Sequence, residues 1–117
     1  MIEVDHLVKK FGDFTAVADL SFLVERGQVM GFLGPNGAGK STTMKMITGF
    51  LRPSSGTARI MGLDIGGDML AAQRHFGYLP EGARAWPDMT PRALLQFIAR
   101  IRDLDKAAAR AAEGRAI

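Results

Sequence analysis

The chain has 117 residues, of which 47% are hydrophobic and 23% charged, a composition ordinary for a globular protein. The absence of cysteine excludes disulfides and thiolate metal sites, and the two histidines are too scattered to suggest a zinc site. The net charge is +3 with dispersed basic residues, so we expect a solvated surface and no nucleic-acid partner. No run approaches the about 18 apolar residues of a membrane span, and Glu3 and Asp5 interrupt any secretory signal. We therefore expect a cytoplasmic chain.

The first third of the chain predicts strands joined by tight turns. Residues 2–8 and 14–24 carry strand-like apolar patterns, and Gly12-Asp13 between them is a turn signal. A second turn at 25–27 leads into residues 28–33, a short, mostly apolar run of the size of a buried strand. The three strands together predict an antiparallel beginning of the fold.

The next segment fills the phosphate-binding template G-x-x-x-x-G-K-[ST] and adds a second hydroxyl. Its residues are Gly34, Pro35, Asn36, Gly37, Ala38, Gly39, Lys40, Ser41 and Thr42. The glycines allow a tight turn that aims successive N–H groups inward. Lys40 can then reach the outer phosphates of a nucleoside triphosphate, and Ser41 can hold Mg²⁺.

The context of this loop favours a binding site over a glycine-rich turn that fits the template by accident. The apolar run at 28–33 precedes the loop, and Met44, Ile47 and Leu51 follow it at helical spacing. Strand, loop and helix is the setting that the template requires. The unpaired N–H groups and the dipole at the start of the helix would attract the same phosphates.

The second half of the chain predicts alternating short elements and then helices. A turn at 53–56 precedes a probable strand at 57–61, a short amphipathic helix at 68–75 and a short buried strand at 76–79. Thr90-Pro91 is typical of a helix start. The helix after it carries an apolar stripe, which we interpret as core, at Leu94, Phe97, Ile98, Ile101 and Leu104. The tail at 106–112 is alanine-rich helix, interrupted by Gly114.

Several segments together resemble the N-terminal half of an ABC transporter ATPase subunit, most of all those that serve ABC-2 type exporters. They are Phe11-Gly12, Leu20-Ser21-Phe22, the loop at 34–42, Phe76-Gly77-Tyr78-Leu79-Pro80-Glu81 and Trp86-Pro87-Asp88-Met89-Thr90. The similarity extends to about residue 112. It implies an α/β fold, the incomplete core of a P-loop NTPase with an N-terminal antiparallel β-subdomain. Residues 1–80 would form that part, and residues 81–117 the Q-loop-like segment and the start of the helical subdomain.

The resemblance also assigns roles to residues outside the phosphate loop, with ATP and Mg²⁺ as ligands. It makes Phe11 the aromatic platform on which adenine stacks, although a core residue at a strand end is the alternative. Glu81 stands where the family usually has glutamine, and it would either approach Mg²⁺ or lie solvated in its loop. Trp86 and Met89 would either face a partner groove or pack under the helix that begins at Pro91.

The motifs that would complete a catalytic site are not in this sequence. It has no apolar run followed by Asp-Glu, no Leu-Ser-Gly-Gly-type signature and no later histidine of the family type. We therefore predict no catalytic residue within this chain. The resemblance implies a transmembrane permease subunit and a second ATPase subunit as partners, and a place on the inner face of the cell membrane.

Two hypotheses about function follow. In the first, the intact protein hydrolyses ATP to drive export, and this chain is its nucleotide-binding front half. In the second, the chain is a non-catalytic nucleotide-binding or interaction fragment. A small P-loop kinase is a weaker third interpretation, because two predicted strands and Phe11 precede the phosphate loop, whereas such kinases usually reach it after one strand.

Overall fold

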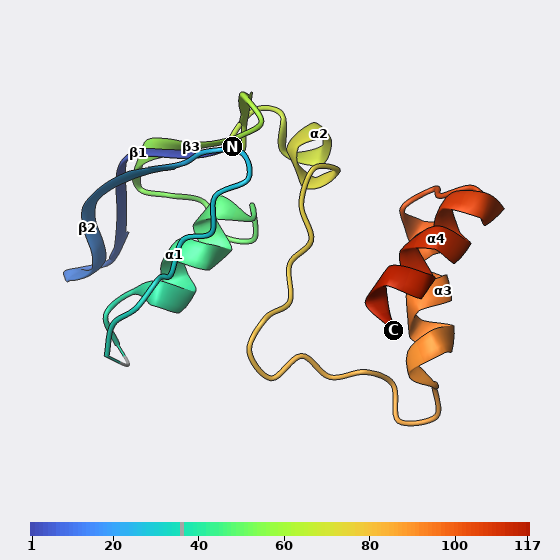
Figure 1. Ribbon diagram of the computed structural model, residues 1–117. Coiled ribbons are helices and arrows are strands. Elements are labelled where there is room, and N and C mark those ends of the chain that lie inside the picture. The colour runs from blue at the N-terminus through green and yellow to red at the C-terminus, as the bar shows by residue number, and fades with distance from the viewer. Residues whose placement is uncertain (36) are drawn as a thin grey trace. The chain divides into compact units, whose positions relative to one another are not determined.

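The computed structural model describes residues 1–35 and 37–117, which form two compact units, Met1–Tyr78 and Leu79–Ile117 (Figure 1). The first unit contains a sheet and two helices, and the second contains two helices. None of the described helices is long and apolar enough to cross a membrane.

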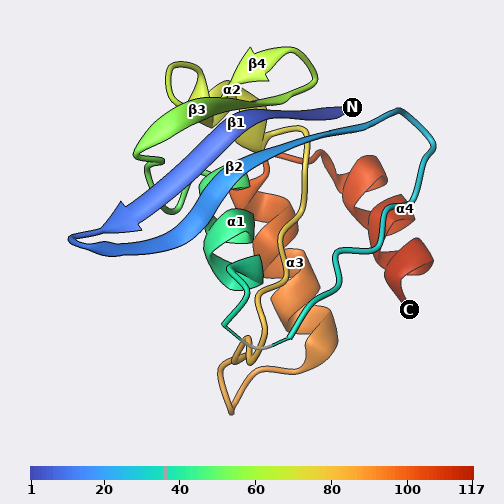
Figure 2. The ribbon, with the colours of Figure 1, turned by 90° about the vertical axis from the view of Figure 1, so that its left-hand side faces the viewer.

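The first unit is built on an antiparallel sheet of β1 (Ile2–Phe11), β2 (Phe14–Val24), β3 (Ser55–Ile60) and β4 (Leu63–Asp64). The strand order is β2-β1-β3-β4, and every neighbouring pair is antiparallel (Figure 2). The predicted pair of N-terminal strands is thus confirmed. The third strand of the sheet is β3, however, so the chain passes through the phosphate loop before it returns to β1.

The β1–β2 ladder is irregular. Its register shifts between Val4 and Leu7, between Leu7 and Lys9, and between Lys9 and Lys10. His6, at φ 46°, and Asp19, at φ 51°, adopt left-handed backbone conformations. Such bulges bend a strand and redirect its side chains, and here they separate the N-terminal half of β1 from the half that ends at Phe11.

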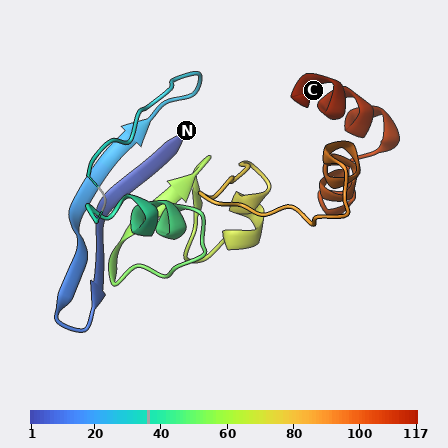
Figure 3. The same ribbon diagram turned by 90° about the horizontal axis from the view of Figure 1, so that it is seen from below.

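Helix α1 (Lys40–Ile47) packs on one face of the sheet (Figure 3), and α2 (Met69–Gln73) follows β4. The hydrophobic core of this unit consists of residues from the sheet, from both helices and from the segment after β4: Val4, Leu7, Val17, Met46, Ile47, Ala58, Ile60, Ile65 and Ala72. Both buried threonines of the α1 region bond their hydroxyls to helix carbonyls, Thr43 to Gly39 at 2.8 Å and Thr48 to Met44 at 2.7 Å. The two buried hydroxyls are thus satisfied within the α1 region itself.

Two predicted strands do not form. Residues 28–33 and 76–79 have no ladder with any described strand. Val29 is 96% and Leu33 94% exposed, so the predicted burial of the first of these segments is wrong as well. A strand exists only where a neighbour receives its backbone hydrogen bonds, and an apolar run identifies a possible strand without identifying that neighbour.

The second unit consists of α3 (Pro91–Ile101) and α4 (Lys106–Ala116). The side chains of Thr90 and Asp105 cap the two helices, accepting hydrogen bonds from backbone N–H groups at 3.1 and 2.7 Å. The helices are joined by an ion pair between Arg92 and Glu113 at 2.5 Å. Helix α4 also continues through Gly114, where the sequence predicts an interruption.

The apolar stripe of α3 is not a core in this structure. No residue of the helix is buried, and Phe97, Ile98 and Ile101 are 39%, 44% and 64% exposed. Within this unit, α3 packs against α4 and Trp86, and these contacts leave the stripe partly exposed. Trp86 packs edge-on against Phe97 with ring centroids 5.6 Å apart, which agrees with the alternative that it lies against this helix.

Candidate functional site

The candidate site is the loop that leads into α1. The N–H of Ala38 donates to the carbonyl of Pro35 at 3.2 Å, which closes a turn, and Gly37 and Gly39 lie in the left-handed region at φ 85° and 88°. Those conformations suit glycine, as the sequence pattern predicts. Asn36, also predicted to bind phosphate, lies outside the described residues.

Gly39 is fixed by its surroundings as well as by its backbone angles. A Cβ atom at this position would lie 2.5 Å from the carbonyl oxygen of Ala16 and 3.1 Å from the side chain of Val17. The last glycine of the loop therefore packs directly on β2. This contact sets the distance between the phosphate loop and the β1–β2 hairpin.

Lys40 is the first residue of α1, and its ammonium donates to the carbonyl of Gly34 at the other end of the loop. The loop is thereby closed around the side chain that the template predicts to reach phosphate. A ligand oxygen would replace this carbonyl as the acceptor. The lysine adds a positive charge beside the uncapped start of α1.

The start of α1 can attract an anion. Its N-cap is Gly39, no side chain caps it, and its first turn contains no acidic residue. The first N–H groups of a helix have no acceptor within the helix, and the helix dipole makes this end positive. Phosphate is the kind of group that satisfies such a helix terminus.

Three hydroxyl residues follow Lys40 and differ in what they can do. Thr43 is buried and its hydroxyl is bonded to Gly39, whereas Ser41 is exposed and Thr42 half-buried. Within the described part of the chain, no group of three or more histidine, aspartate or glutamate residues could hold a metal ion. A hydroxyl oxygen together with phosphate oxygens is instead the donor set that suits Mg²⁺.

Phe11 lies at the end of β1 with half of its side-chain surface exposed, so it is not a core residue. It pairs with Phe14 across the turn into β2, and Phe14 is 63% exposed. Phe14 is thus a second aromatic ring beside Phe11, one that the sequence motifs do not single out. The turn signal at Gly12-Asp13 could have revealed it, because a two-residue turn brings the flanking residues opposite each other.

Glu81, the predicted Q-loop residue, belongs to the second compact unit, in a segment without helix or strand. Its side chain is exposed. An exposed position suits both of the predicted alternatives, a contact with Mg²⁺ and a solvated carboxylate. Its contact with the metal stays a prediction.

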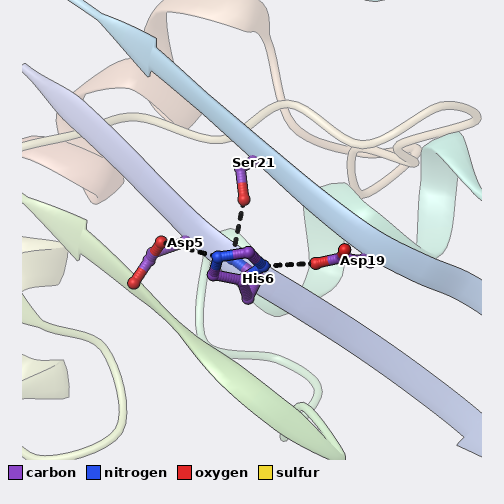
Figure 4. Close-up of polar contacts among 4 residues, drawn as sticks. All are labelled: Asp5, His6, Asp19 and Ser21. Carbon is purple, nitrogen blue, oxygen red and sulfur yellow. Dashed lines mark hydrogen bonds and ion pairs between the residues drawn. The ribbon is translucent and has the colours of Figure 1, made fainter.

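A separate polar cluster lies on the β1–β2 surface (Figure 4). The ring of His6 contacts Asp19 at 2.5 Å and Asp5 at 3.9 Å. The hydrogen bond to Asp19 and the charges of both aspartates raise the pKa of His6 above its ordinary value of 6.5. The hydroxyl of Ser21 accepts from the backbone N–H of His6, at 2.8 Å, and not from the ring. This arrangement does not activate the serine as a nucleophile.

Comparisons with known proteins agree with this geometry. A family model described as ABC transporter matches residues 17–116. A probable multidrug ABC transporter ATP-binding protein of Escherichia coli (strain K12) is 44% identical over 97 residues, 83% of this chain and 17% of that protein. Nod factor export ATP-binding protein I of Ralstonia nicotianae is 41% identical over 100 residues, 86% of this chain and 31% of that protein.

A solved structure of an ATP binding subunit of an ABC transporter matches with a TM-score of 0.81 and 32% identity. The match covers 91% of this chain and 44% of that chain. This chain thus spans less than half of each of these three proteins.

Proposed function

The chain belongs to the ABC transporter family, and we propose that it binds ATP as the front part of the nucleotide-binding subunit of an exporter. One observation carries the proposal. The loop at 34–39 joins an uncapped helix N-terminus, and Lys40 reaches back across the loop. An uncapped helix start with its dipole and a lysine ammonium thus adjoin the same loop, a combination that suits the β- and γ-phosphates of a nucleotide.

The ligands we propose are ATP and Mg²⁺. Lys40 binds the outer phosphate oxygens, and the N–H groups at the start of α1 bind those nearer the ribose. Ser41 contributes its hydroxyl to Mg²⁺, and the metal neutralises charge between the phosphates. The half-exposed ring of Phe11 offers a face to adenine. The proposal does not require Glu81.

The proposed activity of the intact protein is ATP hydrolysis coupled to export through a separate transmembrane subunit, with a second ATPase subunit closing the site. In this scheme the chain itself binds and orients ATP. The carboxylate that activates water and the signature of the opposing subunit would come from elsewhere. The relative that is named as a Nod factor export protein supports export as the direction of transport. The subunit would lie on the inner face of the membrane through its permease partner.

The experiment is a titration of labelled ATP, with and without Mg²⁺, against the chain and two lysine variants. Lys40→Ala removes the ammonium of the loop, and we expect it to abolish measurable binding. Lys45→Ala is the matched control, since Lys45 is an exposed lysine in the last turn of the same helix. Equal affinities for the parent and Lys40→Ala would overturn the proposal, whereas loss in Lys40→Ala alone would support it.

A further inference from the structure

Lys9 touches two parts of the first unit that are distant in sequence. Its ammonium donates to the carbonyl of Arg52 at 2.8 Å, and the same ammonium lies over the ring of Phe11, 5.1 Å from the ring centroid. The side chain is half-buried. A single cation thus connects the end of β1 with the segment that follows α1.

The local strand geometry brings Lys9 and Phe11 to the same face. Lys9 pairs with Val17, Lys10 with Thr15 and Phe11 with Phe14. The extra residue of this bulge therefore lies in β2, and β1 keeps its alternation from Lys9 to Phe11. Residues two apart in a strand point to the same side of the sheet.

The carbonyl that receives Lys9 is itself held in place. The N–H groups of Phe50 and Leu51 both donate to the carbonyl of Lys45 in α1, at 2.8 and 3.0 Å. The N–H of Ser54 donates to Val8 on β1 at 2.8 Å. The segment around Arg52 is therefore bonded to α1 on one side and to β1 on the other.

Lys9 also differs from its neighbour in a way that sequence alone does not reveal. The side chain of Lys10 is exposed, and its backbone N–H donates to the hydroxyl of Ser54 at 2.9 Å. The two lysines carry the same charge and are adjacent. Only Lys9 has its ammonium placed over the aromatic ring.

We propose that Lys9 is a positioning residue for the nucleotide base. Its ammonium covers one face of Phe11 and holds the ring at a fixed place, so that the opposite face receives the purine. Through Arg52 the same ammonium ties this ring to α1, whose other end holds the phosphates. The inference rests on the proposed function, because it assumes that phosphates bind at Lys40 and the base at Phe11.

The test compares Mg-ATP with inorganic tripolyphosphate, which has phosphates and no base. Lys9→Met keeps the aliphatic stem and removes the cation, and we expect it to weaken ATP about 2- to 5-fold, the size of a cation–π contact, with tripolyphosphate unchanged. Lys9→Arg restores a cation that can both donate and stack, and it should recover most of the affinity for ATP. Lys10→Met makes the same change in charge and should leave both ligands unaffected.

The decisive measurement is whether the effects of Lys9→Met and Phe11→Ala on ATP affinity are additive. In a Phe11→Ala background, Lys9→Met should cause no further loss of ATP affinity, because the ring it positions is gone. An equal loss for ATP and tripolyphosphate, an additive loss with Phe11→Ala, or no loss at all would each overturn the inference. Failure of the proposed function gives a different result. In that case Lys40→Ala would bind ATP and tripolyphosphate with the same affinity as the parent chain.

Discussion

The carbonyl oxygen of Ala16 on β2 lies 2.5 Å from the point where a Cβ atom at Gly39 would be. No real Cβ atom tolerates a backbone oxygen at that distance, so one of the two segments would have to move. Gly39 also has a φ of 88°, which is unfavourable for any residue with a side chain. The position of the phosphate loop and the position of the β1–β2 hairpin therefore depend on each other.

The first prediction is that Gly39→Ala lowers both stability and ATP affinity. Left-handed strain alone costs about 1 to 2 kcal/mol, and displacement from Ala16 adds to it. Gly37→Ala is the matched control, because Gly37 has a φ of 85° and no described atom lies within 4 Å of its would-be Cβ. Thermal unfolding should show a larger loss for Gly39→Ala. Equal losses for the two variants would mean that the contact with Ala16 contributes nothing.

The second prediction is that Phe11→Ala weakens ATP and leaves inorganic tripolyphosphate nearly unchanged. Stacking of a base on an aromatic ring is worth about 1 to 3 kcal/mol, and tripolyphosphate has no base to stack. Titration of both ligands measures the difference. A uniform loss would show instead that Phe11 supports the fold.

Phe14→Ala provides the comparison for that experiment. Phe14 pairs with Phe11 and is also exposed, so either ring can be reached from solvent. We expect Phe14→Ala to leave the preference for ATP intact, because Phe14 lacks the cation that Lys9 places over Phe11. A selective loss of ATP binding in Phe14→Ala, with Phe11→Ala unaffected, would assign the platform to Phe14.

The third prediction concerns pH. The pKa of His6 is raised in the folded chain by Asp19 and Asp5, so the protonated ring favours the folded state. This contribution is complete below the ordinary pKa of 6.5 and is lost as the pH rises through the higher folded value. The midpoint of thermal unfolding should therefore fall slightly as the pH rises above about 6.5. The effect is small because the cluster is exposed and screened.

His6→Asn should remove this part of the pH dependence, since asparagine does not titrate and tolerates the φ of 46° found at His6. Asp19→Asn should reduce it by removing the hydrogen-bonded charge. His75→Asn, in the same compact unit, should retain it. A pH profile identical in the parent and in His6→Asn would contradict the assignment to this cluster.

Local sequence patterns predicted several turns, helix starts and strands of this fold. Most of the features that they did not predict depend on contacts between residues far apart in the sequence. Gly37 and Gly39 have left-handed conformations, which suit a tight turn, and the family drawn from the motifs is confirmed by the comparisons. The predicted strand at 57–61 corresponds to β3 (Ser55–Ile60), and Thr90 caps α3 as expected. Each of these features depends on residues that are close together in the sequence.

The errors have a different physical origin. Residues 28–33 are apolar enough for a buried strand, yet they form none, because a strand depends on a neighbour that its own sequence does not identify. The contact of Gly39 with Ala16 lies at a bulge that leaves Ala16 without a partner in the β1–β2 register, and the hydrogen bond of Lys9 to Arg52 joins segments far apart in the sequence. A bulge arises from the pairing of two strands, so neither strand sequence predicts it alone.

The last prediction concerns the 117-residue chain purified on its own, which we expect to be poorly stable and without ATPase turnover. Val29 and Leu33 are almost fully exposed in a segment that has no strand partner in the described chain. Each large apolar side chain left in water forgoes about 1.5 to 3 kcal/mol, against a typical domain stability of about 5 to 15 kcal/mol. An apolar segment with unpaired backbone groups also favours aggregation.

Thermal unfolding with and without Mg-ATP, light scattering and an assay of phosphate release measure these properties together. We expect a broad transition that ATP shifts upward, aggregation that rises with concentration, and phosphate release no greater than in Lys40→Ala. Val29→Lys should reduce aggregation without changing ATP affinity, because it places a charge on the exposed segment and leaves the loop and α1 unaltered. A sharp monomeric transition with Lys40-dependent hydrolysis would contradict the prediction, since the chain would then supply its own means of activating water.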